Sequence, residues 1–297
     1  MSPPPEFFVG TASWTDPTLV KSDLFYPPTA RTAEARLHFY AEHFRTVEID
    51  STYYALLSER NAQLWADRTP ANFIFNIKAF AWLTQHAADA ARLPRAISEI
   101  LPVAQKSARR IKDPPAEVLT LAFQMFWSAL GPLRTAGKLG YLLFQFPPYF
   151  TQRPSNFDYI AGLKLRMPDA PIAIEFRHPS WLGEPRSRAA TLEFLRAHDF
   201  TFVATDTPPE VGLPSILEIT APDVYVRFHG RNRENWFKRD IGAAGRYKYL
   251  YSEAELAQWA GKLKELRGVR RAFAIFNNCY SNFGIMNATT MSHMLAH

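Results

Sequence analysis

Short segments rich in β-branched and aromatic residues alternate along the chain with longer segments whose apolar residues recur every three or four positions. The first pattern is typical of strands and the second of amphipathic helices. A regular alternation of strands and helices, repeated about eight times, predicts an α/β protein with the (β/α)₈ TIM-barrel fold, formed as one domain over residues 1–297. The predicted strands are 7–13, 46–52, 73–79, 141–147, 172–177, 200–206, 224–230 and 271–278.

An open, doubly wound sheet would produce the same alternation, so the first turn from strand to helix distinguishes the two folds. A doubly wound sheet normally carries a glycine-rich phosphate loop at that turn. The chain has GTASWTD at 10–16, which does not fit such a loop. The sequence therefore favours the barrel.

One connection, between the third and fourth predicted strands, is too long for a single helix. It covers about 80–140 and contains PPAEVLTLAFQMFWSALGPL, in which prolines and Glu117 precede a long amphipathic stretch. Proline and acidic residues are favoured in the first turn of a helix. We therefore predict a helical insertion of two or more helices.

Polar residues gather late in the predicted strands, on one face of each. Residues two apart share a face of a strand, so Arg227 and His229 lie together, opposite Val226 and Phe228. In a (β/α)₈ barrel the strand ends surround the active site. The sequence thus predicts a charged pocket at the C-terminal mouth of the barrel. The polar residues at these positions are Glu48, Asp50, Asn76, Lys78, Gln145, Glu175, Arg177, Asp206, Arg227, His229 and Asn277.

These residue types suit acid/base chemistry on an anionic substrate. Glu48 and Glu175 could act as general acid and base, or as the paired carboxylates of a glycosidase, with His229 as a further acid/base group. Either glutamate could instead form an ion pair with a neighbouring cation. We expect an enzyme of hydrolase or lyase type acting on a small or mid-sized anionic substrate, for example a phosphorylated or carboxylated sugar-like molecule. The predicted substrate-binding residues are Trp14, Tyr53, Lys78, Gln145, Arg177, His178, Trp181, Asp206, Arg227, Asn277 and Asn278.

Two other roles of these residues are open. Lys78 could form a Schiff base if its pKa were lowered, although such a lysine more often binds a phosphate or carboxylate. A divalent metal is an alternative, but no compact motif such as H-E-x-x-H occurs, and the cations of the pocket would repel a metal ion. We therefore predict no metal and no cofactor.

The formal net charge of +6 favours anionic partners and leads to an alternative function. The segment GRNRENWFKRDIGAAGRYKYLYS, after the seventh strand, interleaves basic and aromatic residues, as nucleic-acid-binding surfaces do. The chain could therefore be a nucleic-acid-binding or nucleic-acid-processing barrel, with Trp14, Tyr53 or Trp181 stacked on a base. The basic residues of this segment are Arg231, Arg233, Lys238, Arg239, Arg246 and Lys248.

Cysteine usage and apolar runs indicate the compartment. Cys279 is the single cysteine, which excludes an internal disulfide framework and fits a reducing cytoplasm. The first residues do not resemble a signal peptide, and no apolar run is long enough to cross a bilayer. We expect a cytoplasmic protein without membrane contact, and the sequence indicates no oligomeric state.

An ordered series of motifs carries a family resemblance: GTASWTD, FYPP, VEIDSTYYAL, FIFNIKA, LLFQFPPYF, IEFRHPSW, YVRFHGR and AIFNN. Together they resemble domain-of-unknown-function family 72, the YecE-like proteins, over about 9–287. The resemblance implies a (β/α)₈ barrel and a set of site residues, and it implies no particular reaction. In one departure, Gln85 separates Thr84 from His86. The motif residues present are Gly10, Trp14, Glu48, Tyr53, Lys78, Gln145, Pro147, Pro148, Glu175, Arg177, His178, Trp181, Asp206, Arg227, His229, Gly230, Asn277 and Asn278.

Overall fold

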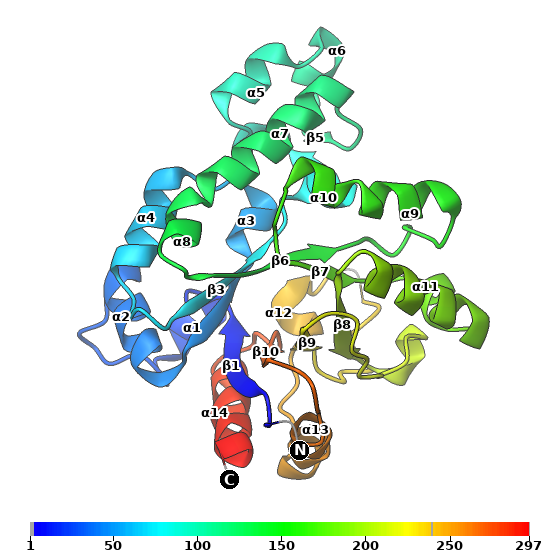
Figure 1. Cartoon of the computed structure of the whole chain (residues 1–297). Coiled ribbons are helices and arrows are strands. Elements are labelled where there is room, and N and C mark those ends of the chain that lie inside the picture. Colours follow the sequence, from blue (N-terminus) through cyan, green and yellow to red (C-terminus); the bar gives the residue numbers. More distant parts are fainter. Residues whose placement is uncertain (1–2, 239, 297) are drawn as a thin grey trace. The chain divides into compact units, whose positions relative to one another are not determined.

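The computed structural model describes residues 3–238 and 240–296 and contains a closed barrel of parallel strands (Figure 1). All eight predicted strands are present, with ends that differ from the prediction by at most three residues. The TIM-barrel prediction is confirmed. Around the barrel the strands follow the order β1 (Glu6–Ala12), β10 (Arg271–Phe276), β9 (Asp223–Phe228), β8 (Thr201–Asp206), β7 (Ile172–Glu175), β6 (Leu139–Gln145), β3 (Ile74–Lys78) and β2 (Thr46–Ile49).

The strands end earlier than the polar pattern suggested. β2 ends at Ile49, β7 at Glu175 and β9 at Phe228, so Asp50 and His229 come directly after their strands and Arg177 comes two residues after its strand. The backbone N–H of His229 still donates to Asp206 O of β8 at 3.0 Å.

The chain divides into two compact units, one formed by Met1–Glu48 with Pro179–His297 and the other by Ile49–His178. The expectation of a single domain therefore stays a prediction. In the first unit, β8, β9, β10 and β1 pair in parallel, and Ala204, Val226, Ala274 and Val9 are successive partners across them. This unit also contains α1 (Pro17–Ser22), α2 (Ala33–His43), η3 (Pro179–Trp181), α11 (Pro185–Ala197), η4 (Pro209–Val211), α12 (Gly242–Arg246), α13 (Glu253–Lys264) and α14 (Phe283–Ala296).

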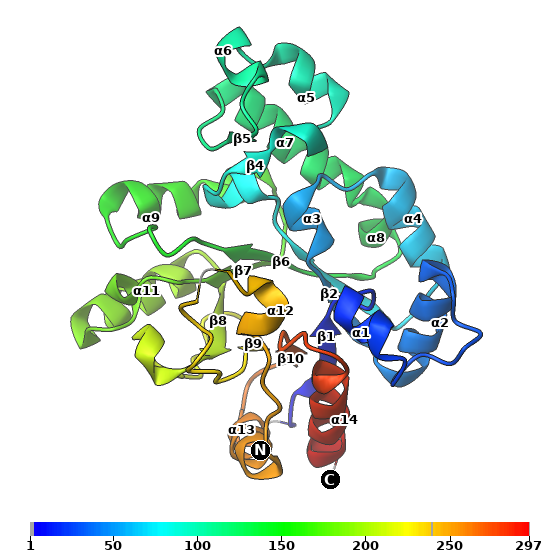
Figure 2. The same ribbon diagram turned by 180° about the vertical axis from the view of Figure 1, so that it is seen from behind.

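Helices α13 and α14 pack against each other, and α14 also covers β1 and β10 (Figures 1 and 2). The start of α13 is well specified by sequence, because Ser252 and Glu255 form a capping box that satisfies free backbone N–H groups of the first turn. Leu256, Trp259 and Leu263 form its buried face. Trp259 thereby reaches the polar network described below.

The second unit contains β3, β6 and β7 with α3 (Ser51–Tyr54), α4 (Glu59–Asp67), α9 (Pro154–Ala161) and α10 (Leu163–Arg166). Asn76 of β3, which the alternation placed on the polar face of its strand, is fully buried at an irregularity in the β3–β6 register. Its Oδ1 accepts a hydrogen bond from Tyr141 N at 2.9 Å. A Cβ at Gly140 would lie 2.4 Å from this oxygen, so the bulge requires glycine there.

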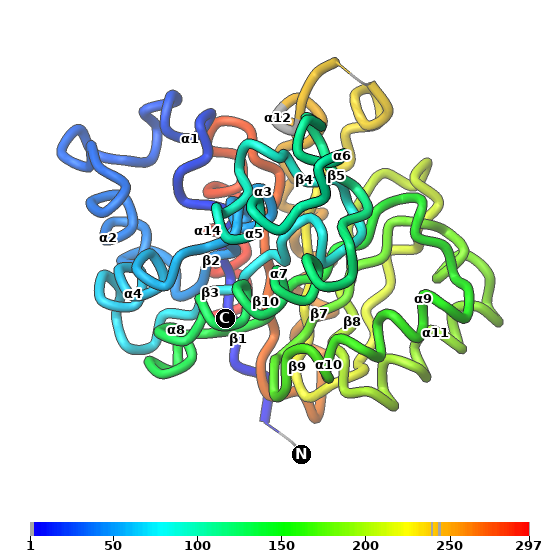
Figure 3. The backbone as a smooth tube through the Cα atoms, turned by 90° about the horizontal axis from the view of Figure 1, so that it is seen from above, coloured from blue at the N-terminus to red at the C-terminus, as the bar shows by residue number. Residues whose placement is uncertain are grey.

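The insertion in this second unit contains the predicted helices and, in addition, a small antiparallel sheet (Figure 3). The sheet pairs β4 (Ala88–Asp89) with β5 (Arg110–Ile111). Strands of two residues carry no periodicity, so the sequence did not predict them. The other elements are η1 (Ala81–Thr84), η2 (Ala90–Arg92), α5 (Arg95–Ile100), α6 (Val103–Lys106), α7 (Ala116–Ala129) and α8 (Gly131–Thr135).

No helix within the described part of the chain is both long enough and apolar enough to span a membrane.

Candidate functional site

The predicted site residues fall into both compact units. The polar contacts of each unit are described separately. Trp14, Glu48, Trp181, Asp206, Arg227, His229, Asn277 and Asn278 belong to the first unit. Tyr53, Lys78, Gln145, Glu175, Arg177 and His178 belong to the second.

Glu48 and Arg227 form the central ion pair of the first unit. The Arg227 guanidinium donates through Nε at 3.0 Å and through NH2 at 2.5 Å to the two Glu48 carboxylate oxygens. The Tyr225 hydroxyl donates to the same carboxylate at 2.8 Å. None of the three side chains is exposed. A buried charge needs a paired charge and hydrogen bonds, and this arrangement supplies both, which favours a structural role for the pair.

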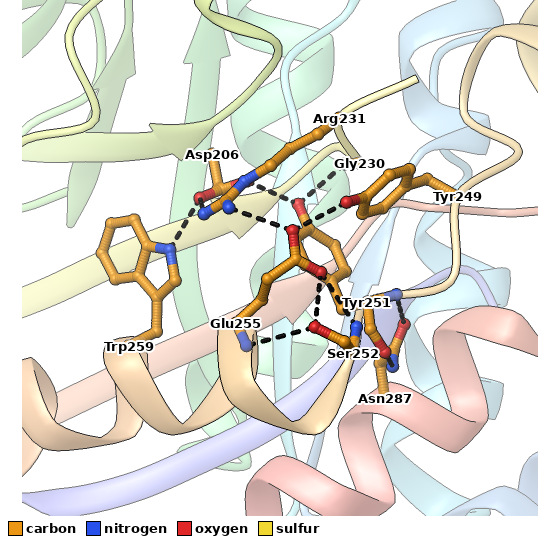
Figure 4. A network of polar contacts seen from close by, with 9 residues as sticks. All are labelled: Asp206, Gly230, Arg231, Tyr249, Tyr251, Ser252, Glu255, Trp259 and Asn287. Carbon is orange, nitrogen blue, oxygen red and sulfur yellow. Dashed lines mark hydrogen bonds and ion pairs between the residues drawn. The ribbon is translucent and has the colours of Figure 1, made fainter. Parts of the chain in front are cut away.

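Asp206, at the end of β8, is the centre of a second network (Figure 4). Its Oδ1 accepts from Arg231 Nε and the Tyr251 hydroxyl, at 2.8 and 2.9 Å. Its Oδ2 accepts from Arg231 NH2 and Trp259 Nε1, both at 2.7 Å. Glu255 holds the other side of the same guanidinium at 3.0 Å. Four donors occupy the carboxylate, so Asp206 anchors the segment after β9.

His229 is fully buried within this unit. Its Nδ1 lies 2.9 Å from Asn277 Nδ2, and the rings of Tyr247 and Trp236 are 5.7 and 6.5 Å from its own. Asn278 donates to Tyr249 O and to Asn287 Oδ1, at 2.8 and 2.9 Å. Trp236 and Tyr247 therefore lie against His229, and Tyr249 is held at the end of β10 by Asn278.

The tryptophans predicted to contact substrate lie in the interior. Trp14 is 7% exposed and donates to Ala33 O at 3.2 Å, and Trp181 is fully buried. The Trp181 carbonyl accepts from Thr191 Oγ1 at 2.9 Å, which joins the loop to α11. These contacts favour a packing role for both tryptophans.

In the second unit, Lys78 ends β3 with its ammonium in a half-buried position. Its Nζ is 3.3 Å from Asp50 Oδ1 and 5.1 Å from the centre of the Tyr53 ring. Thr52 Oγ1 donates to the Lys78 carbonyl at 2.6 Å and so ties α3 to the end of the strand. The lysine side chain keeps 15% of its surface exposed. The Lys78 side chain is therefore mostly but not completely buried.

Glu175 and Arg177 lie at the end of β7 in the same unit. Arg177 Nε is 2.5 Å from Glu175 Oε1, and its NH2 lies 3.4 Å from Gln145 Oε1 at the end of β6. The Glu175 side chain is completely buried, whereas that of Arg177 is 9% exposed. His178, the next residue, is half-buried.

His86 is the titratable group most affected by these cations. Burial, and then the charges of Lys78, Arg110 and Arg177, lower the pKa of His86 to about 4. Gln85 adopts a left-handed conformation, which lets Thr84 Oγ1 reach His86 Nδ1 at 2.9 Å despite the residue between them. His86 is consequently neutral at neutral pH in a strongly positive surrounding.

The basic segment after β9 is largely engaged in internal contacts. Arg231 is held by Asp206, and Arg233 pairs with Glu210 at 3.2 Å. Lys248 lies over the Tyr280 ring at 4.4 Å. Arg239, also predicted to contact nucleic acid, lies outside the described residues.

Across residues 3–238 and 240–296, no group of three or more histidine, cysteine, aspartate or glutamate side chains is arranged to hold a metal ion. The carboxylates weighed as metal ligands from the sequence, Glu48, Glu175 and Asp206, each contact a guanidinium.

Several residues of these networks were missed by sequence reasoning. Trp259 follows the spacing of apolar residues expected for the buried face of any helix, and Tyr251 lies in a loop. Nothing in the sequence therefore linked these two residues to Asp206. Arg110 belongs to the unpredicted strand β5. The basic composition of 80–140 was the only available signal for Arg110.

The closed parallel barrel, with polar residues at its strand ends, defines a TIM-barrel protein. The chain belongs to the family described as "Protein of unknown function DUF72", whose family model matches residues 8–297. The predicted resemblance is thereby confirmed.

Similar proteins agree with this assignment. The chain is 32% identical over 295 residues to the UPF0759 protein YunF of Bacillus subtilis, covering 97% of this chain and 94% of the relative. A DUF72 family crystal structure from Thermotoga maritima matches with a TM-score of 0.76 at 30% identity, over 98% of this chain and 100% of the other. A DUF72 family structure from Enterococcus faecalis matches with a TM-score of 0.77 at 26% identity, over 98% and 96% of the two chains.

Proposed function

We propose that this protein is an enzyme that binds a small anionic substrate through Lys78 and Arg177 and performs hydrolase- or lyase-type acid/base chemistry with Glu175. The observation that carries the proposal is the concentration of positive charge around His86. The pKa of His86 is lowered to about 4, first by burial and then by the charges of Lys78, Arg110 and Arg177. Asp50 and Glu175 pair with Lys78 and Arg177, but among the described residues no acidic side chain pairs with Arg110, so a positive charge is left for a negative group to offset. A phosphate or carboxylate substrate would do so.

Lys78 and Arg177 suit complementary parts of anion binding. The contacts with Glu175 and Gln145 restrict the orientation of the Arg177 guanidinium before a ligand binds. Lys78 presents a compact charge beside the Tyr53 ring. The Arg177 guanidinium and the Lys78 ammonium together can hold a phosphate, and the restricted guanidinium loses little side-chain entropy on binding.

His86 gives Glu175 a second acid/base partner within the same unit. Thr84 Oγ1 lies 3.1 Å from Ala81 O, which can only accept, so the single hydroxyl proton satisfies that carbonyl. His86 Nδ1 then donates to Thr84 Oγ1, and its Nε2 carries the lone pair. An anion bound near Lys78 would raise the pKa of His86 and make Nε2 a stronger proton acceptor.

Glu48 and Arg227 keep a structural role in this proposal, because their hydrogen-bonding groups are used on each other. His229 remains a further acid/base candidate of the first unit. We also propose a cytoplasmic location, on the basis of the single cysteine. The nucleic-acid alternative has weaker support, since acidic side chains already hold Arg231 and Arg233.

A panel of phosphate esters and glycosides, assayed on the wild type and on Glu175→Gln, Lys78→Met and His86→Asn, tests the proposal. Glu175→Gln should lower kcat by about 10²–10⁴-fold, as expected for removal of an acid/base group. Lys78→Met should mainly raise KM. The exposed Glu117→Gln and Lys106→Met are controls that should behave as wild type. Unchanged turnover in Glu175→Gln would show that Glu175 is not the acid/base group, and inactivity of the wild type on the whole panel would reject the substrate class.

A further inference from the structure

A cavity of about 470 Å³ lies in the second unit, at the insertion. Its polar lining consists of Tyr53, Tyr54, Asp89, Arg92, Arg109 and Arg110. This volume lies in the range of small-molecule binding sites. Three arginines and two tyrosines around one cavity are an unusual lining for a gap left by packing.

The small sheet of the insertion brings these residues together. Asp89 of β4 is the partner of Arg110 of β5, and Ala90 N donates to Arg109 O at 3.1 Å. Trp82 Nε1 donates to Ile111 O at 2.7 Å and anchors β5 in the interior. Arg92 follows directly in η2. The arginines thus converge from two segments about twenty residues apart on a fixed backbone frame.

The three arginines that line this cavity outnumber its single acidic residue, Asp89. Among the described residues, no acidic side chain forms an ion pair with Arg92, Arg109 or Arg110. Asp89 lines the cavity, but its Oδ1 accepts from Ala91 N at 3.0 Å. In contrast, Arg177, Arg227 and Arg231 each pair with a carboxylate. Three arginines that form no ion pair, beside a single aspartate, become more favourable when an anion occupies the cavity.

We propose that this cavity is an anion-binding subsite that takes a phosphate group on Arg92, Arg109 and Arg110, with the uncharged part of the ligand packed on Tyr54. The planar guanidinium presents a fork of donors that matches phosphate oxygens. Arg110 NH2 donates to Ala87 O at 2.8 Å, which restrains its guanidinium in advance. The Tyr54 ring, 54% exposed, lies beside the Arg92 guanidinium at 5.9 Å and offers an apolar face to a sugar or a planar ring.

Tyr53 connects this cavity to the Lys78 cluster. Its ring lines the cavity, lies 5.1 Å from Lys78 Nζ and stands edge-to-face with His86 at 5.2 Å. Arg110 also connects the two places, because it lines the cavity and its charge contributes to the lowered pKa of His86. A substrate with two anionic groups would use both places, one group on Lys78 and Arg177 and the other on the three arginines. This extension rests on the proposed function, whereas anion binding in the cavity does not.

Calorimetric titration with inorganic pyrophosphate at low salt tests the subsite. The variant Arg92→Gln/Arg109→Gln/Arg110→Gln should bind at least about tenfold more weakly than wild type, because several charge-assisted hydrogen bonds are lost. A matched control, Arg60→Gln/Arg95→Gln/Arg153→Gln, removes the same charge from exposed arginines of the same unit and should bind within about twofold of wild type. Equal weakening in both variants, unchanged binding in the first, or no binding by the wild type at millimolar pyrophosphate would overturn the proposal.

A second titration tests the substrate with two anionic groups. Wild type should bind a bisphosphorylated sugar at least about tenfold more tightly than the monophosphorylated sugar, and either Lys78→Met or the cavity variant should abolish this preference. If Lys78→Met still prefers the bisphosphorylated sugar while the cavity variant no longer binds pyrophosphate, the proposal of a substrate with two anionic groups is overturned. The proposed anion-binding subsite then stands. If Glu175→Gln retains full turnover while the cavity variant no longer binds pyrophosphate, the proposed acid/base role of Glu175 fails. The proposed anion-binding subsite stands in that case too.

Discussion

Glu48 and Arg227, 179 residues apart in sequence, form a bidentate ion pair in which neither side chain is exposed to solvent. The pair explains why β9, whose other face is apolar, carries an arginine. Arg227 and Tyr225 lie two residues apart on one face of the strand and both donate to the Glu48 carboxylate. The contact therefore joins β2 to β9 inside the first unit.

Breaking this pair should destabilise the fold strongly. Arg227→Met leaves the Glu48 carboxylate buried without its guanidinium, which should lower the free energy of unfolding by about 3–5 kcal/mol. The double variant Glu48→Gln/Arg227→Met should lose less than the sum of the single losses, since no buried charge remains. Urea unfolding measures these differences, and Glu99→Gln, which removes the exposed pair with Arg95, should cost less than about 1 kcal/mol. A loss in Arg227→Met no greater than that of Glu99→Gln would contradict the structural role.

Asp206→Asn should release the segment that follows β9. The substitution weakens the two contacts with Arg231 and should lower stability by about 2–4 kcal/mol, because the partly buried guanidinium then keeps only Glu255 as a charged partner. Limited digestion with trypsin should then cut faster within 231–249. The control Glu210→Gln affects only the exposed pair with Arg233 and should digest as wild type. Wild-type resistance in Asp206→Asn would mean that Asp206 does not anchor this segment.

His86 should make stability depend on pH in a defined window. Its pKa is about 4 in the folded chain and about 6.5 when unfolded, so between these values the unfolded state binds more protons. Stability should therefore fall as the pH drops from about 6.5 to about 4. His86→Asn should be less sensitive than wild type in urea midpoints measured at pH 7 and pH 5.

The titration of His86 can also be followed by NMR, with His86→Asn assigning the signal. Lys78→Met should raise the observed pKa toward the ordinary value, since a nearby positive charge is removed. An imidazole that titrates near 6.5 in the wild type would disprove the positive surrounding on which the proposed function depends.

Gly230 should tolerate no side chain. It has a φ of 85°, and a Cβ would lie 2.6 Å from Tyr249 Cβ. Gly230→Ala should therefore cost about 1–3 kcal/mol through backbone strain, in addition to the clash. Gly261→Ala is a matched control in the interior of α13, where a Cβ meets nothing within 4 Å, and it should stabilise by up to about 1 kcal/mol. Equal effects of the two substitutions in thermal unfolding would contradict the strain at Gly230.

Much of the barrel was predictable because its signals are local. Alternation within a strand and the helical period between strands depend only on neighbouring residues, so 200–206 and 271–278 were placed nearly as observed in β8 and β10. The same alternation correctly grouped Arg227 with the polar face of β9. It also put Asn76 on the polar face of its strand but could not show the bulge against β6, because a bulge is a property of two strands together.

The sequence by itself thus determined the fold class, the family and the polar residues that end the strands. Only the tertiary structure decided which of these residues pair: Glu48 with Arg227, Glu175 with Arg177, and Asp206 with Arg231. It also placed Arg110 near His86, because β4 and β5 pair, and these two-residue strands are too short to show an alternating pattern in the sequence. The physical reason is that a side chain's face is set by the local backbone, whereas its partner is set by strand order and loop packing, which join residues far apart in the chain.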